Sequence, residues 1–88
     1  MAAILKTACA GTLESSDVFV EIGPAQGIEI ELDSVVGDQF GTQIQCSAEE
    51  ILLQYGITDA KLSLKDRGAL DCVIRARVET AIRRSLEV

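Results

Sequence analysis

The sequence contains no histidine and no tryptophan, only one proline, and only three aromatic residues, Phe19, Phe40 and Tyr55. Without histidine, no serine can be paired with an imidazole base, which excludes serine–histidine nucleophilic catalysis. Carboxylates are then the remaining candidates for a general base, so a free-standing enzyme is not expected. The scarcity of aromatic side chains implies a core of isoleucine, leucine and valine. At 88 residues, that core belongs to a single domain spanning residues 1–88.

Cysteine is also scarce, and its three positions, Cys9, Cys46 and Cys72, are far apart and form no Cys-x-x-Cys pair. In the absence of histidine, this spacing predicts no metal site. We expect the three thiols to be free and buried, and to serve as small hydrophobic side chains, which suits a reducing cytoplasm. Alternation places the carboxylates of Glu29 and Glu31 on one exposed strand face, where solvation is the simpler interpretation.

Basic residues are outnumbered, eight against fourteen acidic ones, and the formal net charge is -6. This balance argues against a nucleic-acid partner, because few cations are available to neutralise phosphates. The N-terminal segment is too short for a signal peptide and lacks a basic start. No apolar run approaches the length of a membrane-spanning helix. We therefore expect a soluble, cytoplasmic protein that binds no membrane.

The basic residues are concentrated near the C-terminal end of the chain. Residues 1–60 contain one basic and ten acidic residues, whereas residues 61–88 contain seven basic and four acidic ones. Arginines in the last segment could bind phosphates or an acidic partner through their guanidinium forks. The alternative is charge balance on a solvated helix face, where single ion pairs contribute little. Both interpretations apply to the candidate docking residues Arg75, Arg77, Arg83 and Arg84.

Two segments in the first half have the alternating pattern of strands. Apolar residues recur at every second position in residues 18–22 and again, with acidic residues between them, in residues 28–33. The five residues 23–27 between these segments include proline and glycine, which suits a turn. The sequence therefore predicts a β-hairpin with one apolar and one acidic face.

Residues 34–56 have apolar side chains at helical spacing, although several glycines and a threonine weaken the first half. Ser47 followed by Glu50 has the form of a capping box, and Gly56 suits a helix end. We therefore expect a firm helix over residues 47–55. The preceding part is predicted as either a kinked continuation or a separate turn.

The remaining segments complete an α+β fold. Residues 7–10 and 61–65 are predicted as strands, and a long helix is predicted from Ala69 to about Glu87. The apolar stripe of this helix consists of Leu70, Ile74, Val78, Ala81 and Ile82. The resulting order, β-β-β-α-β-α, indicates a small, mainly antiparallel sheet with two helices packed on one face.

The segment Glu14-Ser15-Ser16-Asp17 places two hydroxyls at a predicted turn just ahead of a strand. One interpretation is purely structural, because these residue types bond to their own backbone and favour turns. The other is an anchor for a covalent modification, which requires an exposed hydroxyl on an accessible loop.

Two separated stretches resemble a known family. Residues 11–18 (GTLESSDV) and 68–77 (GALDCVIRAR) resemble two signature stretches of the citrate lyase acyl carrier protein, or gamma chain. Residues 39–41 (QFG) and 53–55 (LQY) are further matches between them. The resemblance spans nearly the whole chain, in the same order and at similar spacing.

This resemblance implies a non-catalytic carrier of a prosthetic group, 2'-(5''-phosphoribosyl)-3'-dephospho-coenzyme A. A dedicated prosthetic-group transferase joins the group to a serine by a phosphodiester bond, and the matching position is Ser15, with Ser16 as the second candidate. The implied partners are the two large subunits of citrate lyase. The transferase (alpha) subunit exchanges acetyl for citrate on the terminal thiol. The lyase (beta) subunit splits the citryl thioester, and the overall products of citrate cleavage are oxaloacetate and acetate.

Two alternatives remain at this point. A carrier subunit of a malonate decarboxylase-like complex would use the same prosthetic group, although residues 68–77 favour citrate lyase. A non-carrier α+β interaction domain with a Glu-Ser-Ser-Asp turn would instead remain unmodified in its host. Partner capture distinguishes the two carriers, and the intact mass of the chain distinguishes a carrier from an interaction domain.

Overall fold

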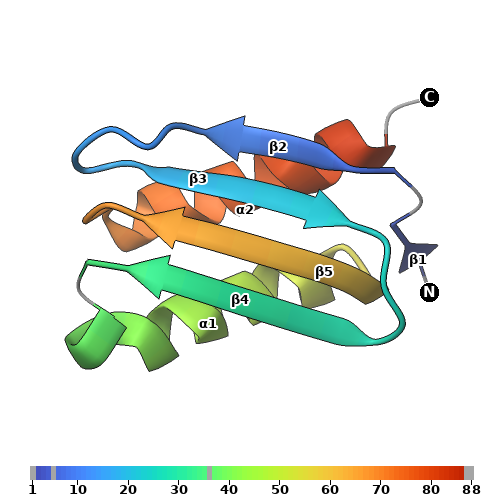
Figure 1. The fold of residues 1–88 in the computed structure, drawn as a ribbon. Helices are drawn as coiled ribbons and strands as arrows, with labels where there is room; N and C mark the ends of the chain where they lie inside the picture. The colour runs from blue at the N-terminus through green and yellow to red at the C-terminus, as the bar shows by residue number, and fades with distance from the viewer. Residues whose placement is uncertain (1, 5, 36, 87–88) are drawn as a thin grey trace.

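The computed structural model describes residues 2–4, 6–35 and 37–86, and the side chains of residues 2, 3 and 37–40 lie outside the description. The elements are β1 (Ala2–Ala3), β2 (Ala8–Gly11), β3 (Val18–Gly23), β4 (Ile28–Ser34), α1 (Gly37–Gln54), β5 (Ile57–Asp66) and α2 (Asp71–Leu86). Apart from the two-residue β1, this is the predicted β-β-β-α-β-α order. Both helices cover the same face of the sheet, α1 behind β4 and β5 and α2 behind β2 and β3 (Figure 1). The α+β fold class is confirmed.

The sheet is mixed. Its central strand, β5, pairs antiparallel with β3 on one edge and parallel with β4 on the other, and β2 pairs antiparallel with the far edge of β3. β1 pairs parallel with the start of β5. β1 and the last turn of α2 lie at the opposite end of the sheet from the loop that joins β2 to β3 (Figure 1).

The predicted hairpin between β3 and β4 is wrong, because β5 lies between these two strands. β4 continues into α1, and the chain then returns as β5, parallel to β4. The linker from β3 to β4 therefore crosses two strand spacings, about 10 Å in total. Gly27 binds the start of β5: its N–H donates to Asp59 Oδ1 at 2.8 Å, and its carbonyl accepts from Ala60 N–H at 2.9 Å. Two alternating strands and a short linker have the same local sequence pattern whether the strands are adjacent or split.

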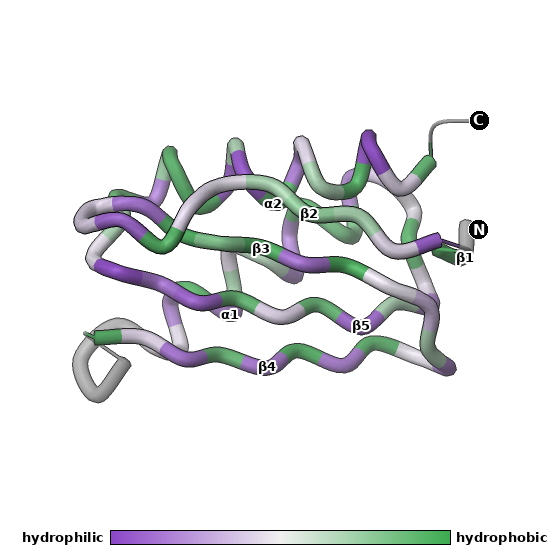
Figure 2. The backbone as a smooth tube through the Cα atoms, turned by 45° about the horizontal axis from the view of Figure 1, so that its top comes forward, coloured by the Kyte–Doolittle hydropathy of each residue, from purple (hydrophilic) through white to green (hydrophobic). Residues whose placement is uncertain are grey.

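The core lies between the sheet and the two helices. In β5 and β4 the hydropathy alternates from residue to residue along the chain (Figure 2). The predicted stripe of α2 is buried at Ile74, Val78, Ala81 and Ile82, but Leu70 is 71% exposed because it precedes the helix. The largest fully buried apolar side chains are Ile4, Ile22, Leu52, Leu62, Leu64, Ile74, Ile82, Val18, Val20 and Val78.

α1 is a single helix that begins at Gly37, so the predicted capping box at Ser47 is wrong. Ser47 lies inside the helix, is 3% exposed, and donates its hydroxyl to Asp71 at the start of α2. This contact joins the second half of α1 to α2. Packing against β4 offsets the poor helix propensity of the first half. The predicted end is confirmed: Gly56 follows the helix with a φ of 67° and donates to the Leu53 carbonyl at 3.0 Å.

All three cysteines are free, as expected, but all three are exposed and not buried. Cys9 lies in β2 next to Ala10, and the alternation of a strand sends Ala10 inward and Cys9 outward. Cys46 and Cys72 lie on the solvent side of their helices. Among the described residues, no helix is both long and apolar enough to cross a membrane.

The central position of β5 makes its core side chains costly to truncate. Leu64 is fully buried, whereas Leu53 on α1 is 79% exposed. We expect Leu64→Ala to lower the free energy of unfolding by about 2–5 kcal/mol. The matched control, Leu53→Ala, should change it by less than about 0.5 kcal/mol. Urea denaturation followed by circular dichroism measures both, and equal losses would contradict this account of the core.

Candidate functional site

The two stretches singled out by the sequence meet at one end of the sheet. The loop of residues 12–17 joins β2 to β3, and the turn of residues 67–70 joins β5 to α2; both lie at the same end of the molecule (Figure 1). Backbone hydrogen bonds connect them directly. Ser16 N–H donates to the Arg67 carbonyl at 2.8 Å, and Arg67 N–H donates to the Asp17 carbonyl at 2.9 Å. The loop is therefore attached to the turn that precedes α2.

Ser15 lies at the second position of a tight four-residue turn. Asp17 N–H donates to the Glu14 carbonyl at 3.1 Å, which closes the turn, and Ser16 at the third position has a φ of 65°. A positive φ at the third position alone is characteristic of a type II turn. Ser15 is exposed, and its hydroxyl makes no hydrogen bond to any other residue that the structure describes. The turn thus presents a free hydroxyl to solvent at its corner.

Asp17 is the polar centre of the loop. Its side chain is 15% exposed. Its carboxylate accepts hydrogen bonds from the Thr12 hydroxyl at 2.7 Å and from Val18 N–H at 2.7 Å. On the other side, Arg77 of α2 donates Nε–H to Oδ1 at 3.2 Å and Nη2–H to Oδ2 at 3.1 Å. The Thr12 hydroxyl, the Val18 amide and Arg77 together lower the pKa of Asp17 to about 2, against the opposing effect of burial. The carboxylate is therefore fully ionised at neutral pH.

The glycine at the end of β2 makes this arrangement possible. Gly11 has a φ of 90°, and a Cβ atom placed there would lie 1.8 Å from the Val18 carbonyl oxygen and 3.3 Å from Cδ of Arg77. The first distance is far inside van der Waals contact, so a larger residue would force the strands apart. The missing side chain also leaves room for the stem of Arg77 as it passes toward Asp17.

The turn that receives the loop is held from below by Asp66, which is fully buried. Its carboxylate accepts the Ser34 hydroxyl at 2.7 Å and Ala69 N–H at 2.9 Å. These bonds fix the turn between the end of β4 and the start of α2. The loop with Ser15 is thus built on elements that are themselves buried and bonded.

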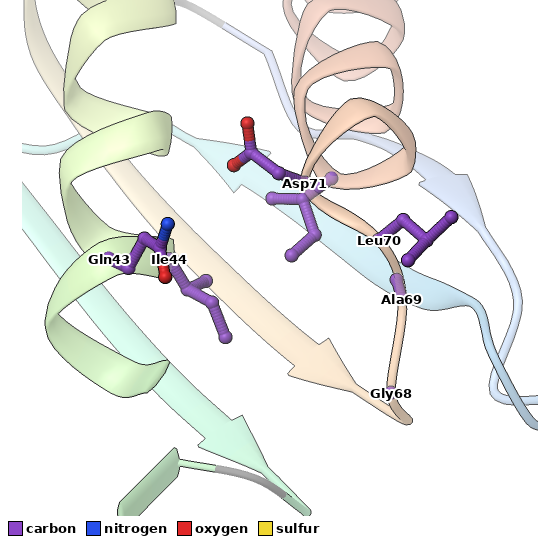
Figure 3. A pocket seen from close by; sticks show the side chains of 7 residues that line it. Gln43, Ile44, Gly68, Ala69, Leu70 and Asp71 are labelled. Atoms are coloured by element: carbon purple, nitrogen blue, oxygen red, sulfur yellow. The ribbon is translucent and has the colours of Figure 1, made fainter. Parts of the chain in front are cut away.

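A groove lies beside the same turn, between α1 and the start of α2 (Figure 3). Its volume is about 360 Å³. Apart from Asp71 and Gln43 its walls are apolar, and Asp71 is bonded to Ser47 and Arg75. The Ser47 hydroxyl and the Arg75 guanidinium lower the pKa of this carboxyl. The groove is lined by Gln43, Ile44, Gly68, Ala69, Leu70, Asp71 and Ile74.

The four arginines proposed for docking all contact other parts of the chain. Arg77 binds the Ser15 loop, and Arg75 binds Glu50 and Asp71, both at 2.7 Å. Arg83 donates to the Tyr55 hydroxyl at 2.9 Å and binds Glu79 at 2.7 Å, and Arg84 donates to the Cys9 carbonyl at 2.8 Å. These contacts tie α2 to α1, to β2 and to the loop. A docking role for these arginines stays a prediction.

The Asp17–Arg77 pair was missed at the level of sequence. The two residues are 60 positions apart, and neither has a local pattern that distinguishes it from other charged residues. The available signal was indirect: Asp17 and Arg77 lie in the two stretches that carry the family resemblance. Within the described residues, no group of three or more cysteine and acidic side chains could hold a metal ion. The site offers an exposed hydroxyl on a turn whose neighbouring residues are bonded to Arg67, Arg77 and Thr12.

Asp17→Asn removes the charge of the central carboxylate while keeping its shape. Because folding lowers the pKa of Asp17, its stabilising effect is complete above the unfolded-state pKa of about 3.9 and disappears as the pH falls through about 2. We expect the variant to lose about 1–2 kcal/mol of unfolding free energy at pH 7, and the difference from the unmodified sequence to shrink between pH 4 and pH 2.

Urea denaturation at pH 7, 4 and 2 measures this effect. Glu14→Gln is the control, because Glu14 is exposed in the same loop and its carboxylate makes no hydrogen bond within the described chain. A difference between Asp17→Asn and the unmodified sequence that is the same at pH 7 and pH 2 would contradict the assignment.

The chain is similar in sequence to known carrier proteins. Residues 5–85 match the family model of the malonate decarboxylase delta subunit (MdcD), an acyl carrier protein. The chain is 50% identical over 84 residues to the citrate lyase acyl carrier protein of Haemophilus influenzae (strain PittEE), covering 96% of this chain and 88% of that one. It is 51% identical over 86 residues to the same protein from Escherichia fergusonii, covering 96% and 89%. The corresponding protein of Treponema denticola is 46% identical, with 96% and 97% covered.

A solved structure has the same fold. A chain in the crystal structure of a Pseudomonas malonate decarboxylase hetero-tetramer in complex with malonate superposes with a TM-score of 0.82 at 21% identity, covering 94% of this chain and 87% of that chain. At this identity the likeness concerns the fold alone. The family is shown by the match over residues 5–85 and by the identities of 46–51%. The chain belongs to the family of citrate lyase acyl carrier proteins.

Proposed function

We propose that this chain is the carrier subunit of a citrate lyase and holds its prosthetic group covalently on Ser15. The observation that carries the proposal is the free, exposed Ser15 hydroxyl at the corner of a turn whose backbone is held by hydrogen bonds. Membership of an acyl carrier family supports a carrier role rather than a catalytic one. The proposed group is phosphoribosyl-dephospho-coenzyme A, joined through a phosphodiester.

The residues around Ser15 suit such a link. The hydroxyl has no partner to give up within the described chain, and the turn corner faces solvent, where a modifying enzyme can reach it. When bound, the group supplies a terminal thiol for thioester chemistry. The contribution of this chain is to fix the starting point of the tether, since the loop is bonded to the 67–70 turn and to Arg77. Because these bonds hold the attachment point, the length of the tether sets the reach, and the tether keeps the local concentration of the bound acyl group high.

Ser15 is favoured over Ser16 by the backbone. Ser16 has the left-handed conformation, and its amide is bonded to Arg67. Its role is therefore to form the turn, a role that glycine fills at least as well. Ser15 has an ordinary backbone conformation and occupies the projecting corner.

The proposed partners are the transferase and lyase subunits of a cytoplasmic citrate lyase, with a dedicated transferase that attaches the group. A carrier of a malonate decarboxylase-like complex is the second candidate, supported by the family model that matches residues 5–85. Capture of the tagged chain from its host distinguishes them, because the two complexes contain different large subunits.

Modification in the native host tests the carrier role directly. We expect the intact mass of the purified chain to exceed the sequence mass by one prosthetic group, and peptide mapping of residues 7–22 to place it on Ser15. Ser15→Ala should remove the adduct completely. Ser16→Gly should keep it, and should leave the stability unchanged or raise it by up to about 1 kcal/mol, because glycine adopts a positive φ without strain.

Three results would change the proposal. An adduct lost in Ser16→Gly and kept in Ser15→Ala would move the attachment to Ser16. An adduct of a different mass would show that the attached group is not phosphoribosyl-dephospho-coenzyme A. An unmodified chain from cells that are fermenting citrate would favour a non-carrier interaction domain.

We further propose that the basic end of α2 docks on an acidic surface of a large subunit. Arg83 is 68% exposed despite its bonds. The neighbouring Arg84 is also exposed, and its hydrogen-bond partner among the described residues is a backbone carbonyl, that of Cys9. Arg84→Glu should therefore weaken co-purification with the large subunits at least threefold while changing the melting temperature of the isolated chain by less than a few degrees. Thr80→Glu, on the same helix, is a control for the added charge. If Arg84→Glu co-purifies with the large subunits as well as the unmodified sequence does, the docking role is rejected, and the arginines serve charge balance within the chain.

A further inference from the structure

We propose that Arg77 is a positioning residue for the attachment of the prosthetic group: through its two hydrogen bonds to Asp17 it holds the Ser15 turn in the conformation that the modifying enzyme binds. This inference rests on the proposed function. It assigns a role to a residue of α2 that is distant in sequence from Ser15, and it connects the two stretches of the family resemblance into one unit.

Arg77 belongs to α2 and holds the loop from outside it. The bonds inside the loop are short-range, between Thr12, Glu14, Asp17 and Val18. Arg77 is the side chain from another element that reaches the loop among the described hydrogen bonds, and it does so with two donors on one carboxylate. A bidentate guanidinium–carboxylate pair fixes orientation as well as distance.

The partner of Arg77, Asp17, belongs to the turn itself. Asp17 is also the fourth residue of the turn that presents Ser15, and its N–H closes that turn. An arginine that orients the Asp17 side chain therefore acts two residues from the reactive hydroxyl. Thr12 binds the same carboxylate at 2.7 Å, from the other end of the loop. Asp17 thus joins both ends of the loop to α2.

The fold makes room for the contact between Arg77 and Asp17. The stem of Arg77 passes beside Gly11, where a Cβ atom would lie 3.3 Å from Cδ. The side chain of Arg77 is 41% exposed, so it lies over the loop at the surface. Arg77 is therefore placed to hold the loop at the surface and is not part of the buried core.

The chemistry of attachment shows why a fixed turn matters. A bond forms between Ser15 Oγ and the phosphorus of a phosphoric anhydride donor, the anhydride bond breaks and releases a phosphate-type leaving group, and the hydroxyl proton passes to a base. The chain has no histidine, and the Asp17 carboxylate is occupied by its three partners. Glu14 is exposed, and no described hydrogen bond directs its carboxylate toward Ser15. We therefore assign the base to the modifying enzyme, which must find the Ser15 hydroxyl at a defined place relative to its own groups.

Arg77→Gln tests the proposal. If the modifying enzyme binds only the ordered turn, disorder reduces the competent fraction, so that KM rises while kcat is retained. We expect KM for attachment of the group by the host's prosthetic-group transferase to rise roughly tenfold, with kcat within about twofold. Arg77→Lys keeps the charge but loses the two-pronged guanidinium, so its KM should lie between those of Arg77→Gln and the unmodified sequence.

Arg75→Gln is the matched control. Arg75 lies on the same helix and also binds two carboxylates, but these are Glu50 and Asp71 and not the loop. Its KM should equal that of the unmodified sequence. Equal KM values for Arg77→Gln and Arg75→Gln would overturn the proposal. If Arg77→Gln does not fold at the assay temperature, Arg77→Lys takes its place, and a KM equal to that of Arg75→Gln would have the same meaning.

Amide hydrogen exchange on the unmodified chain separates this inference from the proposed function. Ser16 N–H should exchange at least tenfold faster in Arg77→Gln than in Arg75→Gln, because its bond to the Arg67 carbonyl depends on the position of the loop. If the unmodified sequence accepts no group at all, the proposed function fails, and the exchange rates still decide whether Arg77 holds the turn. Equal exchange of Ser16 in the two variants would reject that role.

Discussion

The pairing of β5 on both edges is the constraint on which the rest of this structure depends. β5 pairs with β3 along one edge and with β4 along the other, over most of its length. Because its backbone groups are satisfied on both sides, β5 can be buried at the centre, and its apolar side chains belong to the core that the two helices cover. Its last residue, Asp66, ends the strand and holds the turn into α2 with two hydrogen bonds. The position of the Ser15 loop follows from this turn.

The loop is an example of a short segment that owes its form to distant parts of the chain. Its own sequence supplies a turn, but the turn is bonded to residues that arrive after β5 and within α2. Folding of the loop therefore requires the sheet to be complete. A local peptide of residues 11–18 keeps the bonds within the loop but lacks these partners, so part of the order of the loop comes from tertiary contacts.

Much of the fold could be predicted from periodicity alone. The alternation in β3, β4 and β5 and the apolar stripe of α2 are local patterns, and each identified its element. Strand adjacency could not be predicted in this way, because the pattern at residues 18–33 is the same for a hairpin and for a pair split by β5. The role of Ser47 depends on Asp71, which is 24 residues away, and the packing of α1 on β4 is equally non-local. The cysteines were misjudged because composition gives no direction to a side chain. At the site, Ser15 was identified by resemblance, and its exposure could be expected from the turn, whereas the contact of Arg77 with Asp17 required the three-dimensional structure.

The arrangement of the two ends of the sheet has a practical consequence. β1 and the last turn of α2 lie at one end, and the Ser15 loop lies at the other (Figure 1). A support, a dye or a second protein joined near either of these segments would stand a full strand length from the serine. The domain can therefore be displayed on a surface with its Ser15 hydroxyl pointing outward, so that one such layer presents a uniform array of exposed serines.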